Sequence, residues 1–225
     1  MPVFQNIINH LDSRVQHRLD ITSTIALTMG AAWASGINLY AATFMLGYLG
    51  STGEIVLPPG LEVLTNPLVL AASGFMYCVE FFVDKVPGVD TSWDVLHTFI
   101  RIPAGAVLAM QAVGDVHPAA ELAALLIGGS LAAGSHAVKA GSRVIINTSP
   151  EPFSNWVASI GEDVLVIGGL WTALHNPWLF LIGLVVFILL ATWLMPRIWR
   201  GIKRLVQTIG RWLGVKPTSE PPPDK

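Results

Sequence analysis

The amino-acid sequence predicts an all-α fold, a polytopic membrane helix bundle of about six crossings. The first observation is composition: only 12% of the 225 residues are charged, 52% are hydrophobic, and the mean hydropathy is +0.58. A soluble domain carries about twice that share of charged residues. The second observation is a series of apolar segments close to the roughly 20 residues that a helix needs to cross a bilayer. Together they exclude a soluble enzyme and a disordered chain.

The N-terminal part of the chain contains two predicted elements. Residues 1–20 are polar, but their apolar residues recur every three or four positions, which predicts an amphipathic interfacial helix rather than a cleaved signal. Residues 21–50 follow as the first crossing. This segment is long for one crossing and is interrupted by Ser35, Gly36 and Asn38, so we expect a tilted or broken first helix.

Five further crossings complete a predicted transmembrane domain over residues 21–196. They are expected at residues 67–86, 91–112, 118–146, 153–174 and 178–195. The last begins after Asn176-Pro177 and is expected to end at Pro196. Residues 197–214 predict a basic amphipathic helix that binds anionic lipids of the inner leaflet, and residues 215–225 predict a disordered tail.

The distribution of Lys and Arg predicts the orientation, because cytoplasmic loops accumulate these residues. Six crossings place both termini on one side of the membrane. The opposite loops, at residues 51–66, 113–117 and 175–177, contain no Lys or Arg. We therefore expect both termini in the cytoplasm.

The central helices contain a weak internal repeat. A shift of 63 residues places Trp93 on Trp156 and Gly105 on Gly168, which predicts parallel repeats over residues 67–112 and 130–175. Chance similarity between two amphipathic hairpins is the alternative.

A row of small residues also recurs at every fourth position of the fourth crossing, so another helix can approach closely there. The partner is expected to be the second crossing of the same chain, or else a second copy in a homo-oligomer. The row consists of Gly129, Ala133, Ala137 and Gly141.

Ionisable side chains are frequent inside the predicted crossings. Such groups cost about 2.5 to 3.5 kcal/mol each on insertion scales, so they pair or face a watery cavity. Their spacing of three and four residues puts them on one face of each of four consecutive helices. We expect a polar funnel that opens to the cytoplasm and ends halfway across. Its candidate binding residues are Glu80, Asp84, Asp94, His97, Arg101, His136, Lys139, Arg143, Asn155 and Glu162, with Asn38 in the first helix.

Several interpretations of these charges stay open. Any one of them is explained by an internal salt bridge that locks the bundle. Between Glu80 and Asp163, however, carboxylates outnumber the fixed cations by three, and surplus carboxylates with two histidines suit the movement of protons or metal cations. Alternatively, the basic side chains bind an anionic head group or a phosphate. These basic residues are Arg101, Lys139 and Arg143.

A divalent-metal site is a further hypothesis. Asp90, Asp94 and His97 lie on consecutive turns of one helix and, with Glu162 and Asp163, offer ligands suited to Mg²⁺ or Mn²⁺. The alternative is that carboxylates at a helix start stabilise the helix dipole. No other cofactor is implied, and the chain lacks a nucleophile elbow, a P-loop and an HExxH motif.

Other partner classes are not indicated. The net charge of −2 gives no general attraction to nucleic acid. The single Cys78 excludes an intramolecular disulfide framework.

Three stretches resemble a known family. SGINLYAATFMLGYLG, EFFVDKVPGVDTSWDVLHTFIR and KAGSRVIINTSPEPFSNWVASIGED are similar to the bacterial membrane-protein family of domain of unknown function 4126. The resemblance covers roughly residues 22–171. It implies a multi-span protein of the inner membrane, and it implies no activity, substrate or catalytic residue.

The leading functional hypothesis is a small transporter or channel that binds a polar solute or ion in the funnel. The broken first helix favours transport, because unwound backbone at that depth is tolerated only against protein or water. One alternative is a membrane-embedded, metal-dependent enzyme acting on a lipid or its head group, although enzyme activity is the less expected outcome. The other is a non-catalytic assembly factor whose charges are structural.

Overall fold

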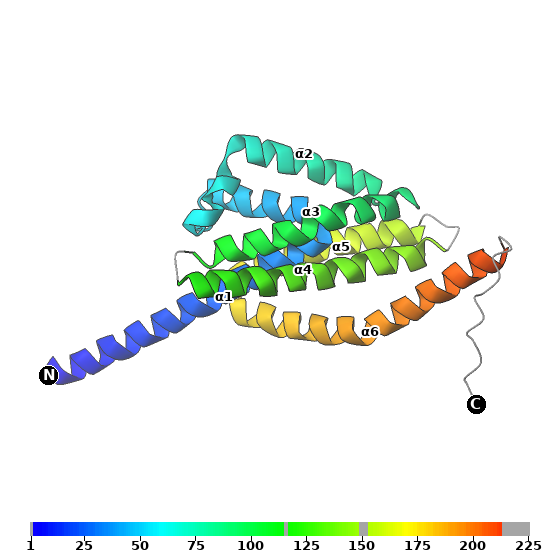
Figure 1. Cartoon of the computed structure of the whole chain (residues 1–225). Coiled ribbons are helices and arrows are strands. Elements are labelled where there is room, and N and C mark those ends of the chain that lie inside the picture. The colour runs from blue at the N-terminus through cyan, green and yellow to red at the C-terminus, as the bar shows by residue number, and fades with distance from the viewer. Residues whose placement is uncertain (1, 115–116, 149–152, 213–225) are drawn as a thin grey trace, which may run out of the picture.

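The computed structural model describes residues 2–114, 117–148 and 153–212, and within them the fold is entirely helical (Figure 1). The all-α prediction is therefore confirmed. The elements are α1 (Pro2–Ser51), the short 3-10 helix η1 (Pro59–Thr65), α2 (Pro67–Val83), α3 (Val89–Ala112), α4 (Pro118–Ile146), α5 (Phe153–His175) and α6 (Pro177–Trp212).

Local sequence explains where two of these helices begin. The Asn66 side chain accepts a hydrogen bond from the backbone N–H of Leu68 at 2.9 Å, and Pro67 occupies the first position of α2. His117 caps α4 in the same way through Nδ1, and Pro118 follows it. A proline at the first helical position lacks only an N–H that has no partner there in any case.

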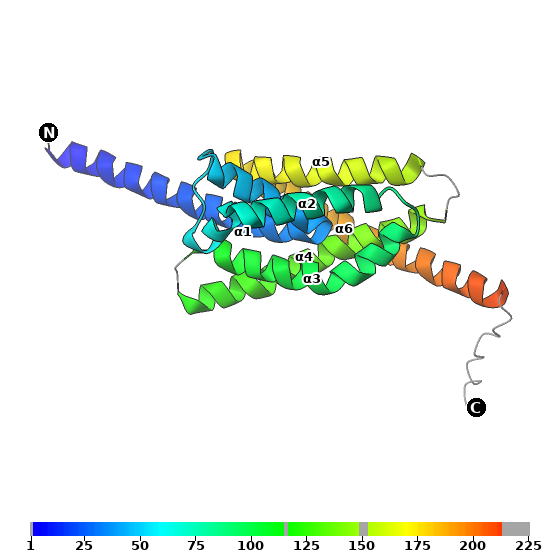
Figure 2. The same ribbon diagram turned by 90° about the horizontal axis from the view of Figure 1, so that it is seen from above.

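The first helix reverses direction at Asn38. This residue has non-helical torsions of φ −146° and ψ 95°, and beyond it the chain runs back toward the end of the bundle from which it came (Figures 1 and 2). Leu27 before the break and Leu46 after it pack in one cluster with Leu57 and Leu61. Residues 21–51 therefore form a re-entrant pair of half-helices rather than a crossing.

The number of full-length helices is consequently lower than the six predicted crossings. Among the described residues, α3, α4, α5 and α6 are long and apolar enough to cross a membrane, and η1 with α2, bent by 70°, makes up to five. The predicted break in the first helix is present, and it changes the end of the bundle at which the N-terminal segment lies. The N-terminal end of α1 and the C-terminal end of α6 lie at opposite ends of the bundle, unlike the predicted arrangement with both termini on one side (Figure 1).

Both predicted amphipathic end segments are continuous with longer helices. Residues 2–20 are helical, continue directly into the first half-helix of α1 and project away from the bundle (Figure 2), and their position at the membrane interface stays a prediction. The sequence also placed a helix end at Pro196, but α6 runs through this proline to Trp212. The predicted tail at residues 215–225 lies outside the described residues.

The central packing joins α1, α3 and α4. Gly105 and Ala109 of α3 approach Gly128 and Ala132 of α4 so closely that a Cβ added at either glycine would meet an alanine Cβ. On this face of α4 the buried small residues are Ala124, Gly128 and Ala132, one position from part of the predicted row, whereas Gly141 of the predicted row is itself buried and closely approached by Ile198 of α6. Their partners are α3 and α1, where the sequence favoured the second crossing.

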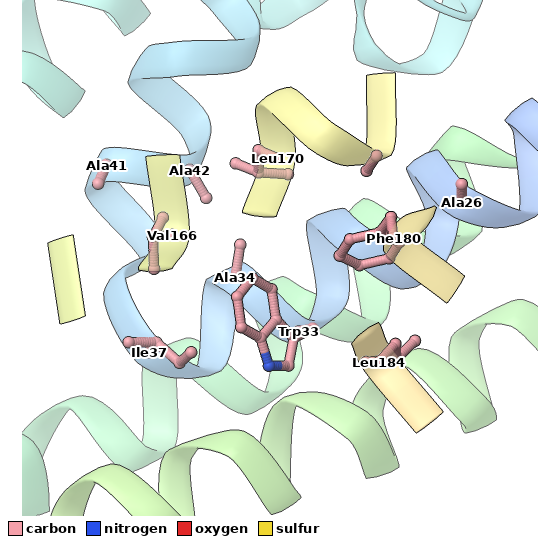
Figure 3. Packing of buried hydrophobic residues seen from close by; sticks show 11 residues of the cluster. Ala26, Trp33, Ala34, Ile37, Ala41, Ala42, Val166, Leu170, Phe180 and Leu184 are labelled. Atoms are coloured by element: carbon pink, nitrogen blue, oxygen red, sulfur yellow. The ribbon is translucent and has the colours of Figure 1, made fainter. Parts of the chain in front are cut away.

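An apolar cluster packs the re-entrant α1 against α5 and α6 (Figure 3). Trp33 stands edge-on to Phe180 of α6, with ring centroids 6.0 Å apart. Val166 and Leu170 of α5 lie against the residues on both sides of Asn38. The cluster holds both half-helices inside the bundle.

The outer faces of the long helices are strongly apolar. Phe99 is 80% exposed and Leu189 is 63% exposed, whereas Arg101 and Glu80 are fully buried. Apolar residues outside and charged residues inside are the pattern expected when the surrounding solvent is lipid. The protein is therefore a multi-pass helical membrane protein.

Candidate functional site

A buried ion-pair network joins α2, α3, α4 and α5. It extends from the middle of the bundle, where Arg101 lies halfway along α3, to the end where α2 meets α3. No charged side chain that forms it is more than 15% exposed. Its charged members are Glu80, Asp84, Asp94, Arg101, Lys139, Arg143 and Glu162.

Arg101 forms the inner part of the network. Its Nη2 donates to Glu80 Oε1 at 2.7 Å, and its Nη1 donates to Asp94 Oδ1 at 2.9 Å. Asp94 and Arg101 lie seven residues apart on α3, so both face the same side of the helix. The guanidinium therefore joins α3 to α2.

Lys139 of α4 lies in the middle of the network. Its ammonium donates to Asp84 Oδ2 at 2.8 Å and to Glu80 Oε1 at 3.1 Å. Glu80 thus shares one oxygen between Lys139 and Arg101. Lys139 also lies 3.6 Å from Glu162 Oε2, so this single cation contacts both α2 and α5.

Arg143 closes the network at its outer end. Nη2 and Nε hold Glu162 in a two-point contact, at 2.6 Å and 3.2 Å, and Nη1 donates to the backbone carbonyls of Asp84 and Asn155. A planar guanidinium is suited to such a fork. Arg143 therefore binds the end of α2 and the start of α5 to α4.

Neutral amides extend the network at this end. Asn147 Nδ2 donates to Asp90 Oδ1 at 2.7 Å, and Asn155 Nδ2 donates to Asn147 Oδ1 at 2.7 Å. The same Asp90 oxygen accepts from the backbone N–H of Gly88 and of Thr91. Asp90 thus acts at the start of α3, as the dipole interpretation of the sequence proposed.

The network has more negative than positive groups. The inward carboxylates Glu80, Asp84, Asp90, Asp94, Glu162 and Asp163 face the three cations Arg101, Lys139 and Arg143. One oxygen of Glu80, Asp84, Asp90, Asp94 and Asp163 is buried without a protein hydrogen-bond partner, as is Nε of Arg101. A buried polar atom without a partner costs about 1 to 3 kcal/mol, so these atoms call for water, protons or a bound ion.

The break in α1 contacts the inner end of this network. Asn38 Oδ1 accepts from the backbone N–H of Ala41 at 2.9 Å, while its Nδ2 donates to Asp163 Oδ1 at 3.1 Å. His136 of α4 lies between the carbonyl of Gly36, at 3.3 Å from Nδ1, and Nη1 of Arg101, at 3.4 Å. The predicted placement of Asn38 among the site residues is consistent with these contacts.

His97 is the predicted site residue that lies apart. Its Nε2 is 3.1 Å from the hydroxyl of Tyr40, its Nδ1 is 2.9 Å from the carbonyl of Trp93, and its ring stacks on Trp93. No contact with a network carboxylate is formed by His97 among the hydrogen bonds of the described residues.

The hypothetical metal ligands are not brought together. Asp94 is bound to Arg101, Asp90 to backbone and Asn147, and His97 to Tyr40. In the part of the chain that the structure describes, no three His, Cys, Asp or Glu side chains converge as metal ligands. The residues present do not fit a divalent ion at this position.

On α5 sequence reasoning named Glu162, which joins the network, but not its buried neighbour Asp163, as a binding residue. It placed Glu162 on the face of Asn155 and Ser159, but the buried face continues through Asp163, Val166 and Leu170, and Glu162 reaches Arg143 from beside it. Asp163, which the sequence offered only as a candidate metal ligand, was thus missed as a binding residue. Tyr40, Asn147 and Thr98 were also missed; Thr98 Oγ1 lies 2.7 Å from His136 Nε2.

Lys85 lies in the turn after α2, close to the network. Its ammonium donates to Ser159 Oγ at 3.3 Å and to the carbonyl of Phe81 at 2.9 Å, and it lies over the Phe81 ring. Loss of hydration lowers the pKa of Lys85, and the nearby carboxylates Asp163 and Asp84 oppose this effect. No carboxylate pairs directly with Lys85 among the described ion pairs.

Fold and site together define a multi-pass helical membrane protein with a buried charged centre. The family model described as domain of unknown function (DUF4126) matches residues 25–197, and the chain belongs to this family. No curated protein and no solved structure matches the chain.

Proposed function

We propose that the protein is a small membrane transporter or channel for an ion or polar solute, coupled to protons or cations. The observation that carries this proposal is the re-entrant break of α1 at Asn38, which contacts the inner end of the charged network. Non-helical backbone at membrane depth is tolerated where it is buried in protein or lines a water-filled path. Broken helices of this kind form ion and substrate sites in transporters.

The residues of the network have distinct roles in this proposal. The carboxylates and His136 respond to protons or cations, because the carboxylates exceed the fixed positive charges and, among the described residues, Glu80, Asp84 and Asp94 each have one buried oxygen without a hydrogen-bond partner. The cations Arg101, Lys139 and Arg143 neutralise them in the closed state and can contact an anion when the pairs open. The carboxylates in this role are Glu80, Asp84, Asp94 and Glu162.

The proposal includes an orientation in the inner membrane. The end of the bundle with the α2–α3 turn and the C-terminal part of α6 carries Lys85, Arg143 and the exposed cations Arg200, Lys203 and Arg204. By the rule that basic residues stay inside, this end faces the cytoplasm, where α6 can contact anionic lipids. The N-terminal segment then lies on the outer side, in contrast to the sequence-based expectation.

Cysteine labelling tests this orientation. In a Cys78→Ser background, single cysteines at Asp12 and Thr52 should react with a membrane-impermeant maleimide that is added to one side of the membrane. A cysteine at Arg204 should react only when the maleimide is added to the other side. The reason is that five crossings separate Thr52 from Arg204 when η1 with α2 is counted as one crossing, and an odd number places the two positions on opposite sides. Reaction of Asp12→Cys and Arg204→Cys from the same side would contradict the re-entrant first helix.

Flux across liposomes tests the function. The full-length protein should transport at least one of a panel of protons, alkali cations and small anions faster than empty liposomes. Glu80→Gln should lower that flux by at least about tenfold, because Glu80 shares one oxygen between two cations and a lost charged partner is worth about 1.4 kcal/mol or more.

The matched control for this assay is Glu62→Gln. Glu62 is an exposed carboxylate in η1, at the opposite end of the bundle from the ion pairs. It should transport as the wild type does. Flux equal to that of empty liposomes for every ion would refute the proposal.

A second candidate, a non-catalytic assembly factor, is favoured by one observation. Each network cation already has carboxylate partners, so the charges are able to serve structure alone. In that case no ion crosses, and network variants change only stability. The metal-dependent enzyme has no comparable support, since its ligands Asp90, Asp94 and His97 are engaged separately.

A further inference from the structure

Among the described residues, Asp163 is the inward carboxylate without an ion-pair partner. Glu80, Asp84, Asp90, Asp94 and Glu162 each lie within 4 Å of an Arg or Lys nitrogen, whereas no such contact is formed by Asp163 among the described residues. Asp163 is nevertheless buried, with only 8% of its surface exposed, and among the described residues its Oδ2 has no hydrogen-bond partner. Among the hydrogen bonds of the described residues, the side chain of Asp163 accepts one, from Asn38.

The surroundings of Asp163 leave its charge poorly compensated. On α5 it is followed by Val166 and Leu170, which pack into the apolar cluster around the α1 break (Figure 3). Lys85, the cation of the α2–α3 turn, is bonded to Ser159, which lies one turn before Asp163 on the same face of α5. A carboxylate in such a place is much less stable ionised than one in water.

The groups facing Asp163 come from three elements, and α6 adds none. From α1 the group is Asn38; from α2 and the turn that follows, the groups are Tyr77, Asp84 and Lys85; from α4 it is Lys139. The side chains that α6 contributes to the adjoining cluster, such as Phe180 and Leu184, are apolar. Lys139 is itself held by Asp84 and Glu80, so its charge is already shared.

We propose that Asp163 is the proton-binding site of the protein, and that it takes up and releases a proton at the break of α1. This proposal rests on the transport function and deepens it, because it names the coupling ion and the group that carries it. The step forms one O–H bond on a carboxylate oxygen, the proton comes from and returns to water, and no other bond changes.

The geometry also indicates how protonation reaches the backbone. Asn38 has two functions, since it donates to Asp163 and caps the second half-helix through Ala41. A hydrogen bond to an ionised carboxylate is roughly twice as strong as one between neutral groups. Protonation of Asp163 therefore weakens the contact that fixes Asn38, and the two half-helices become freer to move relative to α5.

Infrared difference spectroscopy measures this protonation directly. The full-length protein in liposomes is stepped from about pH 9 to about pH 5.5, a range in which exposed carboxylates stay ionised. The wild type should gain a protonated carboxyl C=O band, and Asp163→Asn should lose it. Glu62→Gln, which removes an exposed carboxylate, should keep the band.

Folding of the variants is not expected to limit this experiment. The amide oxygen in Asp163→Asn still accepts from Asn38, and thermal unfolding in detergent checks that the variant is folded. Asn38→Ala supplies a second variant: it removes the donor to the ionised form, so it should move the midpoint of the band to higher pH.

The outcomes separate this proposal from the proposed function. A wild type without a titrating band, or a band that persists in Asp163→Asn, overturns the assignment of Asp163 even if liposome flux is observed. A band that requires Asp163 in a protein that moves no ion supports the proton site and overturns only the transport function.

Discussion

Replacing Arg101 by methionine is expected to lower the free energy of unfolding by about 3 to 5 kcal/mol, the range found when one partner of a buried pair is removed. The guanidinium is fully buried and bonds Glu80 at 2.7 Å and Asp94 at 2.9 Å. Methionine fills much of the volume of the arginine stem but satisfies neither carboxylate. Asp94 then keeps only Lys139, at 3.8 Å. Denaturant unfolding in detergent measures the change.

The origin of the loss is tested by a second substitution. Asp94→Asn in the Arg101→Met background removes the carboxylate that has lost its partner, so the double variant should recover part of the stability. The matched control is Arg197→Met, since Arg197 is exposed on α6 and bonds the carbonyl of Trp193 on its own helix. It should unfold at the wild-type midpoint. Equal losses for Arg101→Met and Arg197→Met would show that the network does not hold the bundle.

The helices of this fold were predictable because their signals are local. The helices α2, α4 and α6 begin where a capping residue is followed by a proline in the first turn. These pairs are Asn66-Pro67, His117-Pro118 and Asn176-Pro177. The break at Asn38 was also predictable, because Ser35-Gly36 and the polar Asn38 interrupt an apolar segment.

The direction of the chain after Asn38 was not predictable from the same signals. Hydropathy and length do not distinguish a helix of 30 residues that crosses from two half-helices that return. The reversal depends on tertiary contacts, such as those of Leu27 and Leu46 with Leu57. For this reason the structure has four helices, or up to five, that can cross a membrane where about six crossings were expected, although most of the helix starts were close to those predicted.

The site was predictable as a set of faces but not as a set of pairs. Spacing on α2, α3 and α4 correctly placed Glu80, Arg101 and Lys139 on inward faces. Spacing alone does not choose between adjacent residues, and on α5 it favoured Glu162 over Asp163. Which carboxylate lacks a cation is decided by side chains from three other elements, and no single-helix pattern contains that information.

Replacing Gly36 by alanine is expected to destabilise the protein by about 1 to 3 kcal/mol or more, as overpacking of a tightly packed interior does. Gly36 lies two residues before the break, where α1 crosses α4. A Cβ built there would overlap the backbone carbonyl oxygen of Ala132 and the hydroxyl of Ser135. The carbonyl belongs to helix α4 and cannot rotate away, so α1 and α4 must separate.

Separation of these helices would also break hydrogen bonds that hold the carbonyl end of the first half-helix. Ser135 Oγ donates to the carbonyl of Trp33 at 2.9 Å, and His136 lies 3.3 Å from the carbonyl of Gly36.

Gly134→Ala on α4 is the matched control, because a Cβ there meets no atom within 4 Å. Alanine is favoured over glycine in a helix by roughly 1 kcal/mol, so this control should be neutral or stabilising. The denaturant midpoint of Gly36→Ala should therefore be lower than that of the wild type. The midpoint of Gly134→Ala should be equal to that of the wild type or higher. Equal midpoints for both variants would mean that α1 and α4 do not approach at Gly36.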